Sequence, residues 1–264
     1  MEELIQVLIA GGIMLAVAVV FGAILVVCSH FLAVRKDERV EQVEKLLANS
    51  NCGGCGKAGC AQFAEALVKG EVKLSDCRAT PTANKEKIAK ILGGGEVGEE
   101  TVAVVHCNGG NACFDKYDYQ GYGNCASCEL IAGGVKACPV GCIGKKTCVD
   151  VCPHHAISVE DGGYAVVDKE KCISCGVCIS DCPKHIIGRI PKSAKVYIAC
   201  SNHGKGKDVM ELCKRGCIGC GICAKNCPVG AIEMKNGLPE IDYTKCIGCK
   251  KCAEKCPRQC IKEH

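Results

Sequence analysis

Cysteines at fixed short spacing constrain this chain more than any other feature of its sequence. Three stretches, residues 172–183, 217–228 and 246–257, share the pattern CxxCxxCxxxCP. Three thiolates two residues apart on a curling loop reach three corners of a cubic [4Fe–4S] cluster, and the fourth, carried away by the start of a helix, reaches a partner cluster. Small residues between them let backbone N–H groups approach the sulfurs. The three runs therefore predict iron–sulfur sites.

Zinc sites and disulfides are the alternatives for such cysteines. Zinc ribbons place two separated CxxC pairs around one tetrahedral ion, which a triplet of cysteines followed by Cys-Pro does not match. Disulfides are rare in reducing compartments. The charges that flank an apolar stretch at residues 8–32, described below, predict that the cysteine-rich part lies in the cytoplasm. Iron–sulfur clusters are therefore the favoured interpretation.

The predicted clusters pair each run with its neighbour along the chain. In the C-terminal module the expected ligand sets are Cys217, Cys220, Cys223 and Cys256, and Cys246, Cys249, Cys252 and Cys227. One cluster of the preceding module takes Cys152, Cys172, Cys175 and Cys178. Its companion is harder to assign, because Lys145 stands where the repeat has Cys220. The expected ligands there are Cys138, the nearest spare thiol, with Cys142, Cys148 and Cys182, and the alternative is that this cluster is missing.

A separate cysteine set precedes these runs. Its members are Cys52, Cys55, Cys60 and Cys77, in the pattern CxxCx₄C followed by a distant cysteine. Alone the set would suit zinc, but beside three iron–sulfur runs it predicts a fifth cluster. A sixth is a further candidate at Cys107, Cys113, Cys125 and Cys128, which otherwise act as small buried apolar side chains. No role is predicted for Cys200, Cys213 and Cys260.

Residues 8–32 form one apolar stretch whose only titratable groups are a thiol and a histidine. At the helical rise of about 1.5 Å per residue it crosses a hydrocarbon layer of about 30 Å. A cleaved signal peptide would have a basic start and a shorter apolar stretch, whereas Glu2 and Glu3 precede this one. Arg35, Lys36 and Arg39 follow it. The positive-inside rule then predicts a protein that crosses the cell membrane once, with its large C-terminal part in the cytoplasm.

The part after the stretch repeats itself and lacks the material for an ordinary core. Cys138-PVG-Cys142 matches Cys213-KRG-Cys217, and each copy continues into a predicted hairpin, AISVEDGGYAVVD and AIEMKNGLPEID. Aromatic residues are 4% of the chain and tryptophan is absent, so clusters must cross-link what packing cannot hold. We expect the metal-free chain to be largely unfolded beyond the anchor.

These features predict an α+β chain of several small pieces. A single N-terminal transmembrane helix, a small 4Fe–4S domain and two tandem two-cluster domains are expected. The boundaries are 1–34 for the anchor, 35–92 for the 4Fe–4S domain, 101–135 for a cysteine-containing connector, and 136–192 and 193–264 for the two-cluster domains.

Several other functions are disfavoured. A net charge of +4 is too small for a typical nucleic-acid binder. The glycines Gly93, Gly95 and Gly98 spell GxGxxG, but a helix-like segment precedes them and a strand-like one follows, the reverse of a dinucleotide site. No Ser/His/Asp arrangement is visible, and His154 and His155 are predicted to be surface residues rather than ligands.

The chain as a whole resembles the B-component family of the Rnf complexes, membrane-bound ferredoxin:NAD oxidoreductases that pump Na⁺ or H⁺. The segments CGGCGKAGC, GCIGKKTCVDVCP and GCIGCGICAKNCP carry the likeness, together with the order of anchor, N-terminal set and ferredoxin repeats. The arrangement is similar to the longer, clostridial-type polyferredoxin members. The resemblance implies a translocase subunit that accepts electrons from soluble reduced ferredoxin and passes them to other membrane subunits, with NAD and flavin bound by partner chains. The alternatives are a polyferredoxin relay subunit of another membrane redox complex, such as a hydrogenase, and a metal scaffold without redox function. Lys145 departs from the pattern and puts one cluster's ligands in doubt.

Basic residues gather around the last cysteine run. They are Lys245, Lys250, Lys251, Lys255, Arg258 and Lys262. We expect this patch to attract an acidic ferredoxin, the alternative being that the lysines only solvate the surface.

Overall fold

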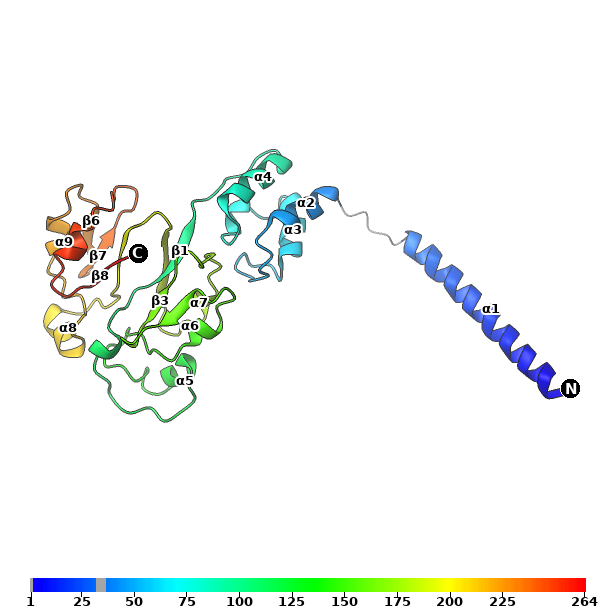
Figure 1. The fold of residues 1–264 in the computed structure, drawn as a ribbon, viewed down its shortest axis with the longest axis horizontal. Helices are drawn as coiled ribbons and strands as arrows, with labels where there is room; N and C mark the ends of the chain where they lie inside the picture. Colours follow the sequence, from blue (N-terminus) through cyan, green and yellow to red (C-terminus); the bar gives the residue numbers. More distant parts are fainter. Residues whose placement is uncertain (1, 32–36) are drawn as a thin grey trace. The chain divides into compact units, whose positions relative to one another are not determined.

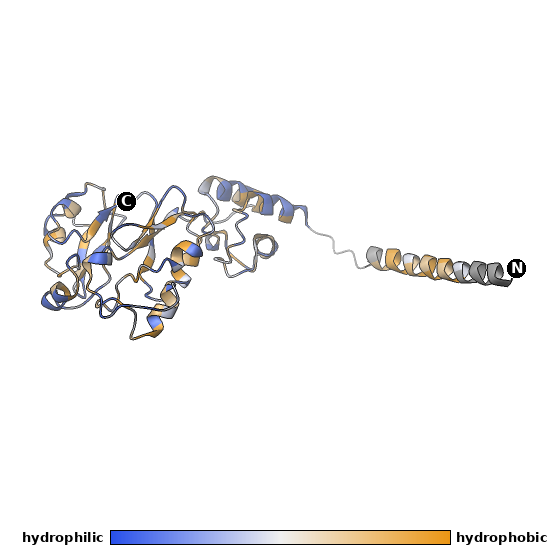
Figure 2. Ribbon diagram, turned by 60° about the horizontal axis from the view of Figure 1, so that its bottom comes forward, coloured by the Kyte–Doolittle hydropathy of each residue, from blue (hydrophilic) through white to orange (hydrophobic). Residues whose placement is uncertain are grey.

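The computed structural model describes residues 2–31 and 37–264 and divides the chain into two compact units, residues 1–38 and 39–264. The first unit contains helix α1, Glu2–Phe31, and its window Gly11–Cys28 is long and apolar enough to cross a membrane. Apolar side chains of this window, such as Met14 and Phe21, are exposed, as a lipid-facing helix requires. Figure 2 shows the hydrophobic colouring along α1. The predicted boundary at residue 34, with Leu32, Arg35 and Lys36, lies outside the described residues.

The N-terminal domain of the second unit is a small helical cluster. Its elements are α2 (Glu38–Leu46), α3 (Cys60–Val68), the 3₁₀ turn η1 (Leu74–Asp76) and α4 (Thr82–Leu92). Val43 of α2, Phe63 of α3 and Ile88 of α4 are fully buried against one another. Val40, Val43 and Leu47 lie on one apolar face, which packs on α3 and α4.

Four two-stranded antiparallel sheets build the rest of the unit. They pair β1 (Thr101–Val105) with β4 (Ile187–Pro191), β2 (Ile157–Val159) with β3 (Ala165–Val167), β5 (Val196–Ile198) with β8 (Ile261–Glu263), and β6 (Ile232–Lys235) with β7 (Leu238–Ile241). The hairpins β2–β3 and β6–β7 confirm the two predicted from sequence. Asn236 and Gly237 form the second turn with positive φ, as an Asn-Gly pair favours.

The two predicted two-cluster domains, here called the first and second ferredoxin modules, share one arrangement of strands and helices. Each begins with a strand, β1 or β5, and ends with the strand that pairs with it, β4 or β8. Between them lie the hairpin and two four-residue helices. The helices are α6 (Thr147–Asp150) and α7 (Val177–Ser180) in the first module, and α9 (Ile222–Lys225) and α10 (Lys251–Glu254) in the second. Outside this arrangement are η2 (Gly110–Ala112), α5 (Cys125–Leu130) and α8 (Gly206–Leu212).

The strand β1 revises the expected domain layout. It falls in the segment 101–135 that the sequence predicts to be a connector, yet it pairs with β4 from Thr101 opposite Pro191 to Val105 opposite Ile187. It also lies beside β3, as Figure 1 shows. Tyr197 and Ala199, from the second module, are buried in the same core as β1. The first module therefore starts near residue 101, and the two modules share a core.

Candidate iron–sulfur sites

The C-terminal module brings its predicted cysteines together around two hollows. One is lined by Cys217, Cys220, Cys223 and Cys256, and the other by Cys227, Cys246, Cys249 and Cys252. The atom-free space in them is about 360 and 330 Å³, including some open solvent. Each hollow thus receives three cysteines from one run and the fourth from the other, the pairing that the sequence predicts.

A recurring backbone arrangement directs N–H groups at the fourth cysteine. The N–H four residues later donates to the sulfur at 3.3 Å in three runs: Ala156 to Cys152, Ala231 to Cys227, and Cys260 to Cys256. The residue before each donor has positive φ, and so does its counterpart in the remaining run: His155, Gly230, Gln259 and His185. Hydrogen bonds to sulfur stabilise a thiolate, the form that binds metal.

The thiol of Cys260 adds to this effect in the last run. Its side-chain hydrogen bonds lower the pKa of Cys256 to about 5 and that of Cys217 to about 7. Cys260 is itself buried, and its thiol lies 3.1 Å from the carbonyl oxygen of Arg215. Sequence alone suggested no role for this residue, because its partners lie on two different runs.

The first module places Cys172, Cys175 and Cys178 with Cys152, as predicted. Burial, followed by the charges of the other three sulfurs, raises the pKa of Cys178 to about 12. The thiol of Cys148, in the neighbouring set, also has its pKa raised to about 12 by burial, and Cys178 is among the sulfurs that contribute to the shift. The two sets are therefore adjacent inside the module, and iron binding to them must displace protons.

The companion set differs from the prediction. Cys142, Cys148 and Cys182 line one hollow together with Cys125, while Cys138 lies at a different hollow. The reason is local: the backbone N–H of Cys125 donates to the hydroxyl of Thr147 at 2.7 Å. This contact anchors the start of α5 beside α6, so the structure places Cys125, and not the expected Cys138, beside Cys142, Cys148 and Cys182.

The side chain of Lys145 does not lie where the side chain of a cysteine at this position would lie. Its ammonium lies 5.5 Å from the ring centroid of Tyr119, in the segment that also carries Cys125. Asn124 caps α5 by accepting a hydrogen bond from the N–H of Ser127 at 2.7 Å. The loop nevertheless keeps the ferredoxin conformation, since Gly144 and Lys146 have positive φ like Gly219 and Gly221 in the repeat. The sequence carried one signal for Cys125: Asn124, a residue type that often caps helices, stands directly before this cysteine, which belongs to none of the cysteine runs.

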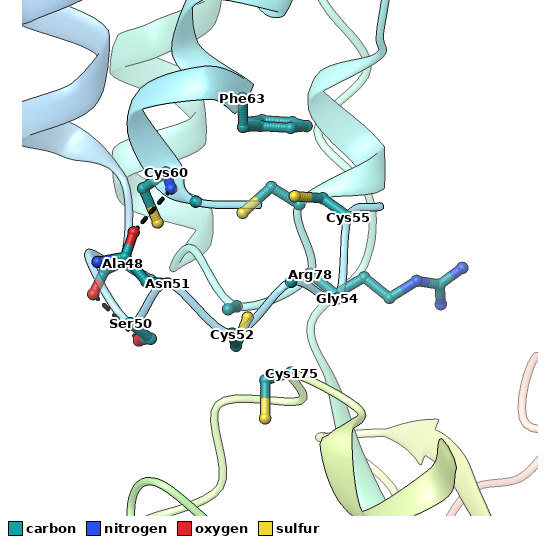
Figure 3. A pocket seen from close by; sticks show the side chains of 14 residues that line it. Ala48, Ser50, Asn51, Cys52, Gly54, Cys55, Cys60, Phe63, Arg78 and Cys175 are labelled. Atoms are coloured by element: carbon teal, nitrogen blue, oxygen red, sulfur yellow. Dashed lines mark hydrogen bonds between the residues drawn. The ribbon is translucent and has the colours of Figure 1, made fainter. Parts of the chain in front are cut away.

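The N-terminal set also surrounds a hollow, shown in Figure 3. Its lining includes Cys52, Cys55, Cys60 and Cys77, as predicted. The side-chain oxygen of Asn51 accepts a hydrogen bond from the N–H of Cys60 at 2.9 Å, and the hydroxyl of Thr80 lies 3.2 Å from the sulfur of Cys77. These contacts fix the loop and the distant cysteine against α3.

The same hollow reaches the first ferredoxin module. Cys175, a member of the neighbouring set, is part of its lining and lies beside Cys52 in Figure 3. A Cβ added at Gly54 would collide with the carbonyl oxygen of Cys175. Glycine at position 54 therefore allows two cysteine sets to approach through their backbones.

The predicted sixth set is divided by the fold. Cys107 and Cys113 lie at one hollow and Cys125 at another, while Cys128 is fully buried with Val135 and Ile143. The hollow of Cys107 and Cys113 also receives three cysteines from elsewhere, Cys138, Cys200 and Cys213. Strand pairing and the repeat bring these five together, and no local spacing indicates it.

The structure also bears on the predictions for two histidines, for the glycine pattern and for the basic patch. His154 and His155 are both exposed, as predicted. Gly93 ends helix α4 in the left-handed conformation and β1 follows, so the glycine pattern does not open a helix. Arg258, counted in the basic patch, instead turns inward and donates to the carbonyl oxygens of Gly216 and Cys213.

The donor sets fit iron–sulfur clusters better than single ions. Each hollow is lined by at least four thiols, and in the two C-terminal hollows backbone N–H groups donate to the sulfurs of Cys227 and Cys256, as in cluster-binding loops. Within residues 2–31 and 37–264, no group of three or more His, Cys, Asp or Glu side chains is arranged to hold one metal ion. The cysteines surround spaces and do not converge on a point.

Comparison with known families agrees with this geometry. An iron–sulfur cluster family matches residues 47–79, which contain the N-terminal set. The family described as a 4Fe-4S dicluster domain matches twice, at residues 141–186 and 216–260. These segments correspond to the N-terminal domain and to the main parts of the two ferredoxin modules.

Similar whole proteins carry one description. The chain is 37% identical to the B component of the Na⁺-translocating ferredoxin:NAD⁺ oxidoreductase complex of Acetobacterium woodii, over 90% of this chain and 72% of the relative. It is 38% identical to the B component of the ion-translocating oxidoreductase complex of Methanosarcina acetivorans, over 85% and 86%. With the proton-translocating counterpart of Clostridium ljungdahlii the identity is 37%, over 92% and 85%. The chain therefore belongs to the B-component family of the ion-translocating ferredoxin:NAD⁺ oxidoreductase complexes.

Proposed function

We propose that this chain is the membrane-anchored electron-transfer subunit of an ion-translocating ferredoxin:NAD⁺ oxidoreductase, and that it accepts electrons from reduced ferredoxin. When bound, a [4Fe–4S] cluster supplies a one-electron redox centre. The observation that carries the proposal is the adjacency of the cysteine sets in the N-terminal domain and the first module: Cys175 lines the same hollow as Cys52, and the sulfur of Cys178 lies close enough to that of Cys148 to raise its pKa. A relay needs such adjacency, whereas separate structural metal sites do not.

We place the ferredoxin-facing surface at the C-terminal module. Apart from Cys28 in α1, the exposed cysteines among the described residues are Cys220 and Cys249, one from each C-terminal set. Ile247 and Val229 beside them are 65% and 40% exposed, which suits a transient apolar contact. Exposed sulfur ligands and apolar side chains together mark a short path between a docked donor and this module.

The charge around this surface suits an acidic partner. Lys251 and Lys255 are exposed, whereas Lys250 pairs with Glu263 and Lys245 with Asp242. The steering charge is therefore expected from Lys251 and Lys255 rather than from all six basic residues of the sequence patch.

Charge reversal tests this surface. Reduced ferredoxin is mixed anaerobically with the full chain in detergent, and the reduction of the chain's clusters is followed by rapid-freeze-quench EPR. We expect Lys251→Glu with Lys255→Glu to slow the second-order rate at low salt by about tenfold, with the difference shrinking as salt is added. The matched control is Lys87→Glu with Lys90→Glu, on α4, which changes the net charge equally. Equal rates for both double variants would refute the docking surface.

The charges that flank α1 support one membrane topology. We propose that α1 anchors the chain and that the unit 39–264 faces the cytoplasm, supported by Glu2 and Glu3 before the apolar stretch and Arg39 after it. A protease added to intact cells should leave this unit whole, and should degrade it once the membrane is opened. Degradation in intact cells would contradict the orientation.

Partner chains are proposed to bind NAD⁺ and to translocate the ion. The glycine-rich segment at residues 93–98 follows a helix and precedes β1, so it does not form a dinucleotide loop. This division leaves the present chain with electron transfer alone, which needs thiolate ligands but no general acid or base.

A further inference from the structure

Five cysteines meet at a hollow outside every segment that matches a cluster-binding family. They are Cys107, Cys113, Cys138, Cys200 and Cys213. The matched segments, residues 47–79, 141–186 and 216–260, contain none of them. The atom-free space here is about 340 Å³, between the values of the two C-terminal ferredoxin hollows. The hollow is thus of the same size and composition as the predicted cluster sites.

The internal repeat builds this hollow from equivalent positions. Cys107 follows β1 as Cys200 follows β5, and Cys138 stands four residues before Cys142 as Cys213 stands before Cys217. Their environments repeat as well: the N–H of Cys142 donates to the sulfur of Cys107, and the N–H of Cys217 to that of Cys200, both at 3.3 Å. Four thiols are therefore contributed as two matched pairs.

Polar groups donate hydrogen bonds to these sulfurs, as they do to the sulfurs of the predicted ferredoxin ligands. The side-chain amide of Asn202, itself 8% exposed, donates to the sulfur of Cys138 at 3.3 Å. A Cβ added at Gly109 would lie 3.1 Å from the sulfur of Cys213 and 3.6 Å from that of Cys107. A thiol that only fills space needs no N–H donor, and burying donors against it carries a cost. Donors aimed at sulfur suit thiolates that bind metal.

Cys113 is the member without a counterpart in the repeat. It bridges to Cys213 across an isolated strand pair, and its thiol contacts the sulfurs of Cys138 and Cys213. Cys113 thus acts toward these two sulfurs as Cys260 acts toward Cys217 and Cys256, as a donor beside a ligand set.

We propose that Cys107, Cys138, Cys200 and Cys213 bind a sixth [4Fe–4S] cluster and that Cys113 donates a hydrogen bond to it. Assembly exchanges the four thiol protons for four iron–sulfur bonds. The ligands come equally from the two modules, so the cluster joins them.

The role of this cluster rests on the proposed function. Its sulfurs are hydrogen-bonded by the backbones of Cys142 and Cys217, which belong to the nearest ferredoxin set on either side. The site therefore lies between the two modules and completes a continuous series of cysteine sets from the N-terminal domain to the C-terminus. Its existence is testable without ferredoxin, so failure of the relay and failure of the site give different results.

The first test is the cofactor content of the unaltered full chain. After anaerobic purification and reconstitution, iron and acid-labile sulfide are measured per polypeptide, with ⁵⁷Fe Mössbauer spectra to confirm cubic clusters. The proposal expects about 24 of each, six clusters of four irons. A stable value of about 20 would overturn it, whatever the chain does with ferredoxin.

The second test assigns the ligands by elimination. Cys113→Ser should keep about 24 irons, which leaves the other four thiols of the hollow as ligands. Cys200→Ser should lose about four irons and four sulfides. The matched control is Cys128→Ser, a fully buried thiol remote from this hollow, which should keep all of them.

The elimination holds even if a ligand variant misfolds. A Cys200→Ser protein that loses more than four irons has disturbed neighbouring sites, and the assignment is then decided by Cys113→Ser, which replaces a thiol donor by a hydroxyl donor. Loss of about four irons in Cys113→Ser, against none in Cys128→Ser, would overturn the assignment. Retention of about 24 irons in Cys200→Ser would overturn it equally.

Discussion

At the scale of single residues, Cys125 lies at the hollow where the repeat leads one to expect a cysteine at position 145. The loop around Lys145 keeps the ferredoxin backbone, with positive φ at Gly144 and Lys146. The thiol at the hollow belongs to the first residue of α5, whose backbone N–H donates a 2.7 Å hydrogen bond to Thr147. The site is thus specified by backbone shape, and the fourth thiol is supplied by another segment.

This arrangement predicts a rescue. Cys125→Ser should lower the iron content by about four per chain, because it leaves three thiols at one cubic site. Adding Lys145→Cys should restore the lost iron, since that position matches Cys220 in the repeat. Iron and sulfide are measured in the single and double variants, with Cys128→Ser as control. Full iron in Cys125→Ser, or no recovery in the double variant, would contradict the assignment.

At the scale of elements, the N-terminal domain meets the first ferredoxin module through a backbone contact. Gly54 packs directly on the carbonyl of Cys175, and the side chains of Ser50 and His154 lie 3.2 Å apart nearby. A side chain at position 54 would separate the two cysteine sets, and electron transfer falls steeply with distance. The contact is therefore small in area but decisive for a relay.

Gly54→Ala should loosen this contact. Overpacking of this kind costs about 1–3 kcal/mol, so amide hydrogen exchange around residues 50–56 and 172–176 should accelerate by about tenfold or more. Gly123→Ala is the control, because a Cβ there meets nothing within 4 Å. Exchange unchanged from wild type in Gly54→Ala would mean that the domain is held by other contacts.

Contacts between distant elements limit what the sequence alone can predict. The runs containing Cys217 and Cys246 and the turn at Asn236 were predictable, because their geometry is set within a dozen residues. The place of Cys138 was not, because it depends on Asn202, 64 residues away. The pairing of β1 with β4 was not predictable either, because it joins segments at the two ends of the module.

At the scale of the molecule, cysteine sets take the place of a large core in the second unit. The shared core of the two modules is mostly valine, isoleucine and alanine, and its buried residues include only two aromatic side chains, Tyr164 and Tyr197. Each cysteine set joins segments that are far apart in sequence, as Cys107 and Cys213 are. Metal sites that cross-link a chain in this way contribute folding free energy directly.

Removal of iron should therefore unfold the unit. We expect anaerobic chelation to abolish the cooperative thermal transition of residues 39–264, followed by circular dichroism, while the helical signal of α1 remains. Reconstitution with iron and sulfide should restore the transition, which separates unfolding from chemical damage. A cooperative transition that survives in iron-free protein would show that packing alone holds the fold.

If this chain is an iron–sulfur relay that ferredoxin reduces, the purified full chain must take up electrons from reduced ferredoxin. An anaerobic titration with reduced ferredoxin measures this directly, with the electrons taken up per polypeptide counted from the EPR signals of the reduced clusters. We expect rapid uptake of several electrons per chain. Iron-loaded protein that takes up none from reduced ferredoxin, or protein that holds zinc without sulfide, would contradict it.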